Sequence, residues 1–156
     1  MGDGQRAMGK RLRIPLFVMV VAALAAGAAC SMFTTSGDIP PPPDVAAPPS
    51  DSLKTTTGLS IKVLQRGSGS RRPRVTDRVT VHYTGWTTDG KMFDSSIARA
   101  EAATFRVDGV IAGWTEALQR MVEGDKVRVW IPEELAYQGQ DPKGMLVFDI
   151  ELIKIE

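Results

Sequence analysis

The chain has 156 residues, of which 43% are hydrophobic and 24% are charged, and its formal net charge is +1. These values are typical of one globular domain with appended segments. From residue 55 to the end there are 14 basic and 14 acidic residues. This balance argues against nucleic acid as a partner, because phosphate binding requires a clear basic excess.

Residues 1–30 have the layout of an export signal. A basic segment precedes the uncharged apolar run 14–29, and Cys30 follows the small residues AGAA. This order resembles a bacterial lipoprotein signal, in which a lipid is attached to the cysteine. Two alternatives remain open: cleavage that releases a soluble protein, and an uncleaved membrane anchor. All three place the following domain outside the cytoplasm, in the cell envelope or on the periplasmic side, with the membrane as a partner in the anchored forms.

Cys30 is the only cysteine, which excludes an internal disulfide and a cysteine-based metal site. We therefore expect neither a metal nor another cofactor.

A proline-rich stretch follows the export segment. Residues 34–51 read TTSGDIPPPPDVAAPPSD, and six of these 18 residues are proline. With no apolar periodicity, this composition favours extended polyproline II over a packed core. We predict a disordered tether over residues 31–54, which could hold a domain roughly 50 Å from its anchor. The alternative is a ligand for a proline-recognising domain.

Four stretches of the remaining chain have the pattern of β-strands. Residues 60–64 and 79–84 alternate between apolar and polar, and the TTDG that follows the second stretch predicts a hairpin. Residues 126–131 also alternate, and Pro132 would end that strand. Residues 145–155 are apolar on both faces in places, which is typical of a central strand.

One stretch has helical spacing instead. In residues 113–124, GWTEALQRMVEG, the apolar side chains recur on one face, and Gly124 is placed to end the helix. Several antiparallel strands with one short amphipathic helix predict an α+β fold over residues 55–156. The economical arrangement is a curved antiparallel sheet, a half-barrel, wrapped around that helix.

Asp94 raises a question, because it directly follows Phe93 on an otherwise core-forming strand, and an unpaired buried carboxylate is costly. The surrounding motifs give an answer. VHYTG, DGKMFDSS, GVIAGWTEALQRM, the pair AY and LVFDIELIKIE occur in this order between residues 81 and 156. In order and spacing they resemble the FKBP-type peptidyl-prolyl cis-trans isomerases. The resemblance implies an apolar pocket between the half-barrel and the helix, and Tyr83 and Arg99 as partners of the Asp94 carboxylate.

The resemblance also implies a set of site residues. The Ile111 amide and the Tyr137 hydroxyl would bind substrate carbonyls, and Trp114 would form the pocket floor beneath a proline ring. His82 lies on the opposite strand face from Tyr83 and is expected to be structural. The implied catalytic residues are Tyr83, Asp94, Ile111, Trp114, Tyr137 and Phe148, and the implied substrate-binding residues are Phe93, Arg99, Phe105 and Val110.

Two positions depart from the family pattern. Ala103 stands where an aromatic residue is usual, and the loop 138–144 is shorter and more polar than in better-known members. The short loop weakens the expectation of macrolide binding more than that of the reaction. We expect a monomeric domain acting on proline-containing polypeptides. The alternatives are a holdase or proline-peptide binding module with little turnover, and a structural lipoprotein that uses the fold as an adaptor.

Overall fold

The computed structural model describes residues 37–156, and the predicted export segment 1–30 with Cys30 lies outside the described residues. Within them, no helix is long and apolar enough to cross a membrane. The elements are β1 (Leu53–Lys54), β2 (Ser60–Gln65), β3 (Arg78–Thr87), β4 (Met92–Ser95), β5 (Ala103–Arg106), the 3-10 turn η1 (Val107–Gly109), α1 (Ala112–Leu118), β6 (Lys126–Ile131), the 3-10 turn η2 (Glu133–Leu135) and β7 (Leu146–Ile155).

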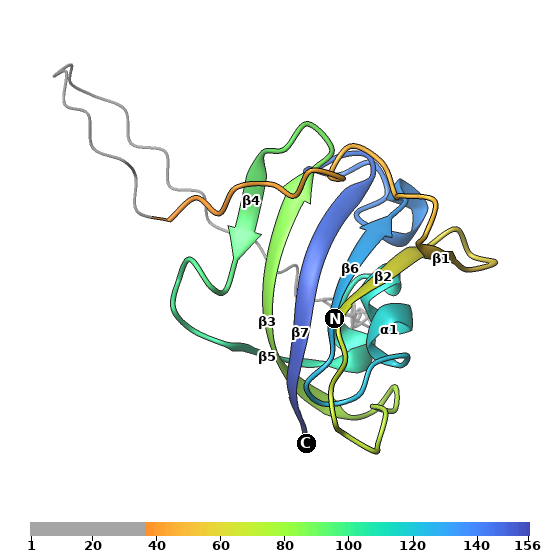
Figure 1. Ribbon diagram of the computed structural model, residues 1–156, viewed down its shortest axis with the longest axis vertical. Helices are drawn as coiled ribbons and strands as arrows, with labels where there is room; N and C mark the ends of the chain where they lie inside the picture. The colour runs from red at the N-terminus through yellow and green to blue at the C-terminus, as the bar shows by residue number, and fades with distance from the viewer. Residues whose placement is uncertain (1–36) are drawn as a thin grey trace, which may run out of the picture. The chain divides into compact units, whose positions relative to one another are not determined.

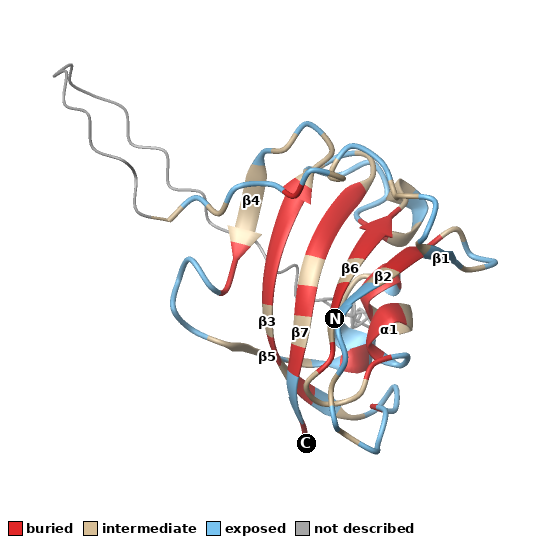
Figure 2. Cartoon of the chain, viewed as in Figure 1, coloured by how far each residue is buried: buried red, intermediate tan, exposed pale blue. Residues whose placement is uncertain are grey.

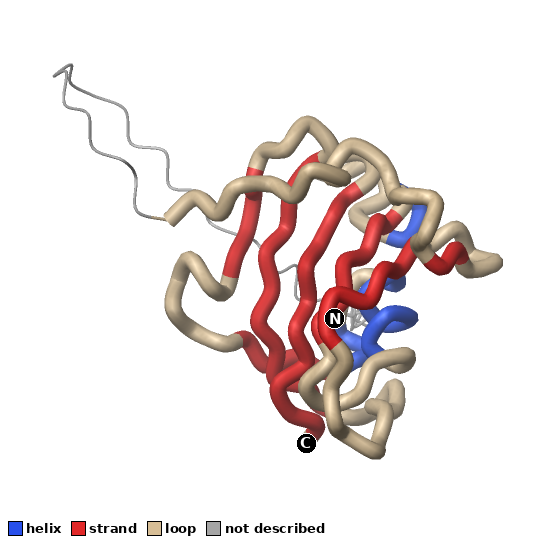
Figure 3. Tube along the Cα trace, viewed as in Figure 1, coloured by secondary structure: helices blue, strands red, loops and turns tan. Residues whose placement is uncertain are grey.

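The strands form one antiparallel sheet in the order β1-β2-β6-β7-β3-β4. β5 pairs with the first residues of β3, Arg78 to Val81. The sheet is open and curled, and the single α-helix within residues 37–156 packs against its concave face (Figures 1 and 3). The predicted fold class, a half-barrel around one short helix, is confirmed. The long strand β7 is central, as expected, because it pairs with both β3 and β6.

Alternation along the strands separates a concave face from a convex face. Side chains at Val81, Val129 and Ile150 belong to the main core, together with Trp114 and Leu118 of α1. Figure 2 shows the buried stretches of β3, β7 and β6 side by side. This packing of one sheet face on one helix supplies the apolar burial that stabilises the domain.

The helix is shorter than the sequence predicted. It ends at Leu118, and Met121 is buried by the turn that follows rather than by a further helical turn. Gly124 does not end the helix; it has a φ of +89° in the connection to β6, where its amide donates to the Leu152 carbonyl. Inside α1, a Cβ on Gly113 would lie 2.4 Å from Cγ2 of Ile131, so glycine is what allows the helix to approach β6 closely.

The expected disordered tether is wrong for its described part. Residues 39–45, here called the proline strap, cross the convex face of the sheet (Figure 1). The indole N–H groups of Trp86 and Trp130 donate to the carbonyls of Ile39 and Asp44, respectively. The physical reason is that two large aromatic side chains stand on the face that the strands turn away from the core, and the strap covers them.

Candidate functional site

An aromatic cluster lies where α1 meets the concave face. The Trp114 ring makes edge-to-face contacts with three rings: Tyr83 at a centroid distance of 5.1 Å, Phe148 at 5.4 Å and Phe105 at 5.8 Å. Phe93 in turn meets Phe148 edge to face at 5.4 Å. Five predicted site residues from five elements are therefore brought together, and edge-to-face contacts are a favourable arrangement for such rings.

Backbone geometry in β3 makes room for two of these rings. A Cβ on Gly85 would lie 2.7 Å both from Cε1 of Phe148 and from Cζ of Phe93. Only glycine leaves space for both rings against the strand at this position. Gly85 was not predicted as a site residue. A glycine inside a strand often marks a place where another group approaches the backbone closely, and this was the signal available in the sequence.

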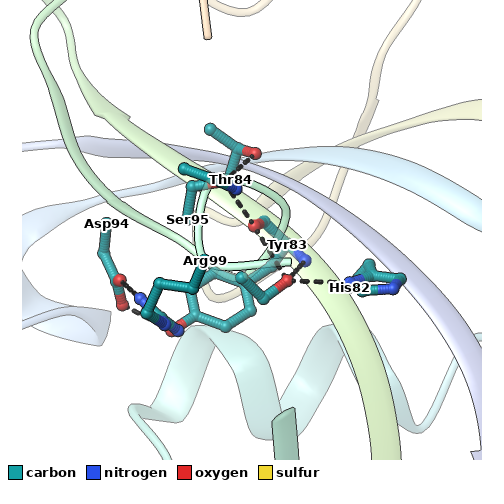
Figure 4. Close-up of polar contacts among 8 residues, drawn as sticks. His82, Tyr83, Thr84, Asp94, Ser95 and Arg99 are labelled. Carbon is teal, nitrogen blue, oxygen red and sulfur yellow. Dashed lines mark hydrogen bonds and ion pairs between the residues drawn. The ribbon is translucent and has the colours of Figure 1, made fainter. Parts of the chain in front are cut away.

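The Asp94 carboxylate has the two partners that the resemblance implied. The Tyr83 hydroxyl donates to one carboxylate oxygen, and the Arg99 guanidinium donates to the other. A second Arg99 nitrogen donates to the Tyr83 hydroxyl at 3.1 Å, and this guanidinium lies 5.8 Å from the centroid of the Tyr83 ring. The three side chains thus form a closed triangle (Figure 4). Asp94 tolerates its position because both of its oxygens are bonded.

The triangle and its burial change the acidity of Tyr83. Burial of the phenol, followed by its hydrogen bond to Asp94, raises the pKa of Tyr83 from an ordinary value of 10.0 to about 12. Burial and then the negative charge of Asp94 raise the pKa of Tyr137 as well. Both phenols therefore remain hydrogen-bond donors at neutral pH.

Two serines that the sequence analysis missed fix the position of Tyr83. The Ser96 hydroxyl accepts from the Tyr83 amide at 2.8 Å and bonds Nδ1 of His82 at 3.1 Å. The Ser95 hydroxyl bonds the Thr84 hydroxyl at 2.9 Å (Figure 4). Among the described residues, the only hydrogen bond of the His82 ring is to Ser96, and its structural role stays a prediction. Serines directly after Asp94 were visible in the sequence, but nothing there indicated which backbone groups they would bind.

The remaining predicted residues lie at the edge of the cluster. Val110 and Ile111 are partly exposed, and Tyr137 is 37% exposed, so that most of the residue is covered. The Ile111 carbonyl accepts from the Trp114 and Thr115 amides, whereas its own amide has no partner among the described residues. The Trp114 indole N–H is also buried without a partner within residues 37–156.

The pocket expected over Trp114 stays a prediction. A different pocket among the described residues, about 420 Å³ in volume, is lined by Glu133, Glu134, Gln138 and Gly139, next to Tyr137 in the sequence. The Trp114 side chain is only 4% exposed because neighbouring rings cover it. A ligand would therefore meet the cluster at its partly exposed edge, formed by Phe93, Phe105, Val110 and Ile111.

This arrangement suits non-covalent binding of an apolar group flanked by carbonyls. The rings offer an apolar surface, and the Ile111 amide offers a donor at its edge, while the Tyr137 phenol lies near enough to Asp94 for that charge to act on it. The carboxylate of the site is held by two donors rather than presented to a reacting atom. Such a surface binds and orients a ligand.

Comparisons with known proteins agree with this geometry. A family model described as FKBP-type peptidyl-prolyl cis-trans isomerase matches residues 69–153. The chain is 49% identical over 112 residues to the macrophage infectivity potentiator of Trypanosoma cruzi, covering 68% of this chain and 57% of that protein. It is 49% identical over 107 residues to the FKBP-type 22 kDa peptidyl-prolyl cis-trans isomerase of Escherichia coli, covering 65% and 52%.

The similarity extends to solved structures. The crystal structure of FkpA from Escherichia coli aligns with a TM-score of 0.65 at 42% identity, covering 69% of this chain and 53% of that one. A peptidyl-prolyl cis-trans isomerase from Pseudomonas syringae aligns with a TM-score of 0.63 at 39% identity, covering 69% and 83%. The chain spans about half the length of the curated relatives it matches.

Proposed function

The chain belongs to the FKBP-type peptidyl-prolyl cis-trans isomerases, and from this we propose that its folded domain catalyses cis–trans isomerisation of Xaa-Pro bonds in polypeptides. The observation that carries the proposal is the aromatic cluster around Trp114, contributed by the residues at which this chain matches the family. The alternative of a binding module with little turnover is not favoured, because the relatives are named as isomerases.

The chemistry of the reaction fits a site without a nucleophile. An Xaa-Pro bond interconverts over tens to hundreds of seconds unaided, because rotation loses amide resonance across a barrier of about 18–20 kcal/mol. A catalyst has only to bind the twisted amide more tightly than either planar form. The twisted amide is less dipolar than the planar one, so an apolar surface of aromatic rings favours it over water.

Each residue then has a role in that selective binding. The proline ring packs at the exposed edge of the cluster, against Phe93 and Phe105, with the covered Trp114 indole behind these rings. The free amide of Ile111 and the Tyr137 hydroxyl hold carbonyls on either side of the bond. Phe148 packs behind Trp114 and Phe93, and the Asp94–Arg99 pair holds the Tyr83 side chain in position. Each ~1.4 kcal/mol of selective binding gives a tenfold increase in rate.

Location and clients complete the proposal. Residues 1–30 act as an export segment, with Cys30 as the lipid-attachment residue, so the substrates are exported or envelope polypeptides. The support for this is the order of basic, apolar and small residues before the cysteine. Mass spectrometry of the mature N-terminus tests it: peptides from residues 1–20 in the mature protein would overturn cleavage, and an unmodified Cys30 at a cleaved terminus would overturn lipidation.

A peptide assay tests the activity. The purified full chain is mixed with an Ala-Leu-Pro-Phe-type peptide, and isomerisation is followed through a protease that cleaves only the trans form. The expected result is first-order acceleration proportional to enzyme concentration. No acceleration over the uncatalysed rate, by a chain with an intact thermal unfolding transition, would refute the enzymatic proposal.

A further inference from the structure

A second buried apolar cluster lies on the face of the sheet opposite the aromatic cluster. Trp86, Val147 and Trp130 form one row across β3, β7 and β6, because Val147 pairs with both tryptophans. Their exposures are 2%, 0% and 0%, yet none of the three belongs to the main core. An uncovered row of this kind would be a large exposed apolar patch, which usually marks an interaction surface. Here the proline strap covers it.

The donors of this row match the acceptors of the strap. The Trp86 indole donates to the Ile39 carbonyl at 3.0 Å, and the Trp130 indole donates to the Asp44 carbonyl at 2.9 Å. Four consecutive prolines lie between these two carbonyls, and Pro42 among them is buried. Prolines have carbonyls but no N–H. The tryptophan row offers indole donors and apolar area, and a run of prolines docked on it has no backbone amide that would need an acceptor.

The spacing of the row also fits an extended chain. Trp86 and Trp130 stand two strands apart, which is about 9.6 Å at the usual strand separation. The bonded carbonyls of Ile39 and Asp44 are five residues apart, and an extended proline-rich chain at about 3.1 Å per residue covers the distance with length to spare. Val45 donates its amide to the Pro42 carbonyl, so a turn over residues 42–45 presents the Asp44 carbonyl to Trp130.

A charged contact fixes the end of the strap. Arg128 bonds the Asp44 carboxylate at 2.7 Å through one nitrogen, and it bonds Asp149 through two others at 2.6 and 2.9 Å. These side chains are largely buried, at 14% exposure for Arg128, 21% for Asp44 and 16% for Asp149. The guanidinium therefore selects an acidic residue directly after the proline run.

We propose that the convex row of Trp86, Val147 and Trp130, with Arg128, is a binding site for a proline-rich segment followed by an acidic residue, and that residues 39–45 occupy it in cis. The site is separate from the aromatic cluster, because alternate residues of the same strands point to opposite faces. Prolines suit the occupant, since their fixed φ reduces the entropy lost when the chain docks.

Occupation in cis determines where the chain leaves the domain. The described chain is docked from Ile39 onward rather than from residue 55, which shortens the reach of the predicted tether by about 45 Å at 3.1 Å per residue. It also attaches the tether to the face opposite the aromatic cluster.

The test compares three forms of the full chain by acrylamide quenching of tryptophan fluorescence. Two of the three tryptophans lie under the strap. A released variant carries Pro42→Ser and Asp44→Asn, and a matched control carries Pro43→Ser and Asp38→Asn at exposed positions. We expect the quenching constant of the released variant to rise about twofold, because both indoles become accessible, and that of the control to equal the unmodified chain.

A peptide of residues 37–51 then measures the site itself. Short flexible linkers give an effective concentration in the millimolar range, so a strap docked most of the time requires an intrinsic Kd below about 1 mM. Added to the released variant, the peptide should reverse the extra quenching with a half-effect at or below that concentration. A peptide with alanines in place of the four prolines, and one with Asp44→Asn, should bind at least about tenfold more weakly.

Three results would overturn the proposal: a released variant quenched like the unmodified chain, a peptide without effect at about 10 mM, or an alanine peptide that binds equally well. If the variant with both Pro42→Ser and Asp44→Asn unfolds, Asp44→Asn alone replaces it in the quenching comparison, because this change removes only the ion pair with Arg128. Isomerase activity is measured in parallel and should be unchanged in all forms, so a failure of this site is distinguishable from a failure of the proposed activity.

Discussion

Replacing Asp94 with asparagine removes a charge while keeping the shape of the side chain, so it isolates the triangle with Tyr83 and Arg99. The carboxylate is 14% exposed and accepts from both partners. An asparagine keeps one acceptor oxygen for one of the two donors, Tyr83 or Arg99. Its amide N–H₂ faces the other donor, which therefore loses its hydrogen-bond acceptor. A hydrogen bond to a charged group contributes about 1.5–3 kcal/mol. The Arg99 side chain is 48% exposed, so solvent screening limits its ion pair to about 0–1 kcal/mol.

The expected loss in free energy of unfolding is therefore about 2 kcal/mol. Urea denaturation measures it, and the midpoint should fall while the slope with urea stays constant. The matched control is Asp108→Asn, because Asp108 also makes two bonds to an arginine, Arg106, but on the open surface. That control should leave the urea midpoint unchanged.

A second measurement on the same variant checks the cause. Loss of the hydrogen bond and charge of Asp94 should lower the pKa of Tyr83 from about 12, while burial keeps it above 10.0. Absorbance of the ionised phenol reports this pKa when it is measured in a Tyr137→Phe background, because the chain has two tyrosines. The reasoning is refuted if the Asp94 and Asp108 variants unfold at the same urea concentration, or if the Tyr83 pKa does not move.

Three further predictions concern the phenols and the ring packing. Because the pKa of Tyr83 is raised in the folded chain, stability is fully present below pH 10 and should fall as pH rises from 10 to about 12; thermal unfolding across that range checks it, and a flat profile would contradict the raised value. Gly85→Ala should destabilise the domain by about 1–3 kcal/mol and lower isomerase activity, because its Cβ overlaps Phe93 and Phe148. Gly109→Ala, whose Cβ would meet Arg106 at 3.5 Å, is the control, and equal urea midpoints for the two variants would count against the overlap. Tyr137→Phe should lower kcat/KM about fivefold, equivalent to one hydrogen bond of about 1 kcal/mol, with an unchanged melting temperature; full activity would remove Tyr137 from the proposed substrate contacts.

Most of the fold could be predicted because strand alternation is a local signal. Residues 126–131 were bounded correctly, and the TTDG turn was placed where Gly90 adopts a φ of +88° between β3 and β4. The helix was drawn too long, since Met121 fits a helical period although the turn after Leu118 buries it. Periodicity reports which side chains are buried, but it does not report which backbone buries them.

The aromatic cluster and the Asp94 triangle were predicted only through the resemblance. Trp114, Phe105 and Phe148 are far apart in the sequence, and without a family pattern each is an ordinary core residue. The hydroxyls of Ser95 and Ser96 were missed because small polar residues after a strand occur in many loops. Which backbone group each one binds depends on the register of β3 with β4.

The strap was missed although its partners were visible. In residues 81–86 the alternation that turns Tyr83 inward turns Trp86 outward, and in residues 126–131 it turns Trp130 outward beside Arg128. Two tryptophans on the outer faces of two strands require a cover. The proline run was interpreted by composition alone, and composition cannot show that a receptor surface exists elsewhere in the same chain.

The alternation of side chains along β7 limits the insertions and deletions that the gene can tolerate. Val147 lies under the strap, and its neighbour Phe148 lies in the ring cluster on the other side. Gain or loss of a single codon ahead of this pair would exchange the two orientations, placing a phenyl ring beneath the prolines and a valine against the indole of Trp114. Length variation among natural versions of this chain should therefore stop short of Leu146.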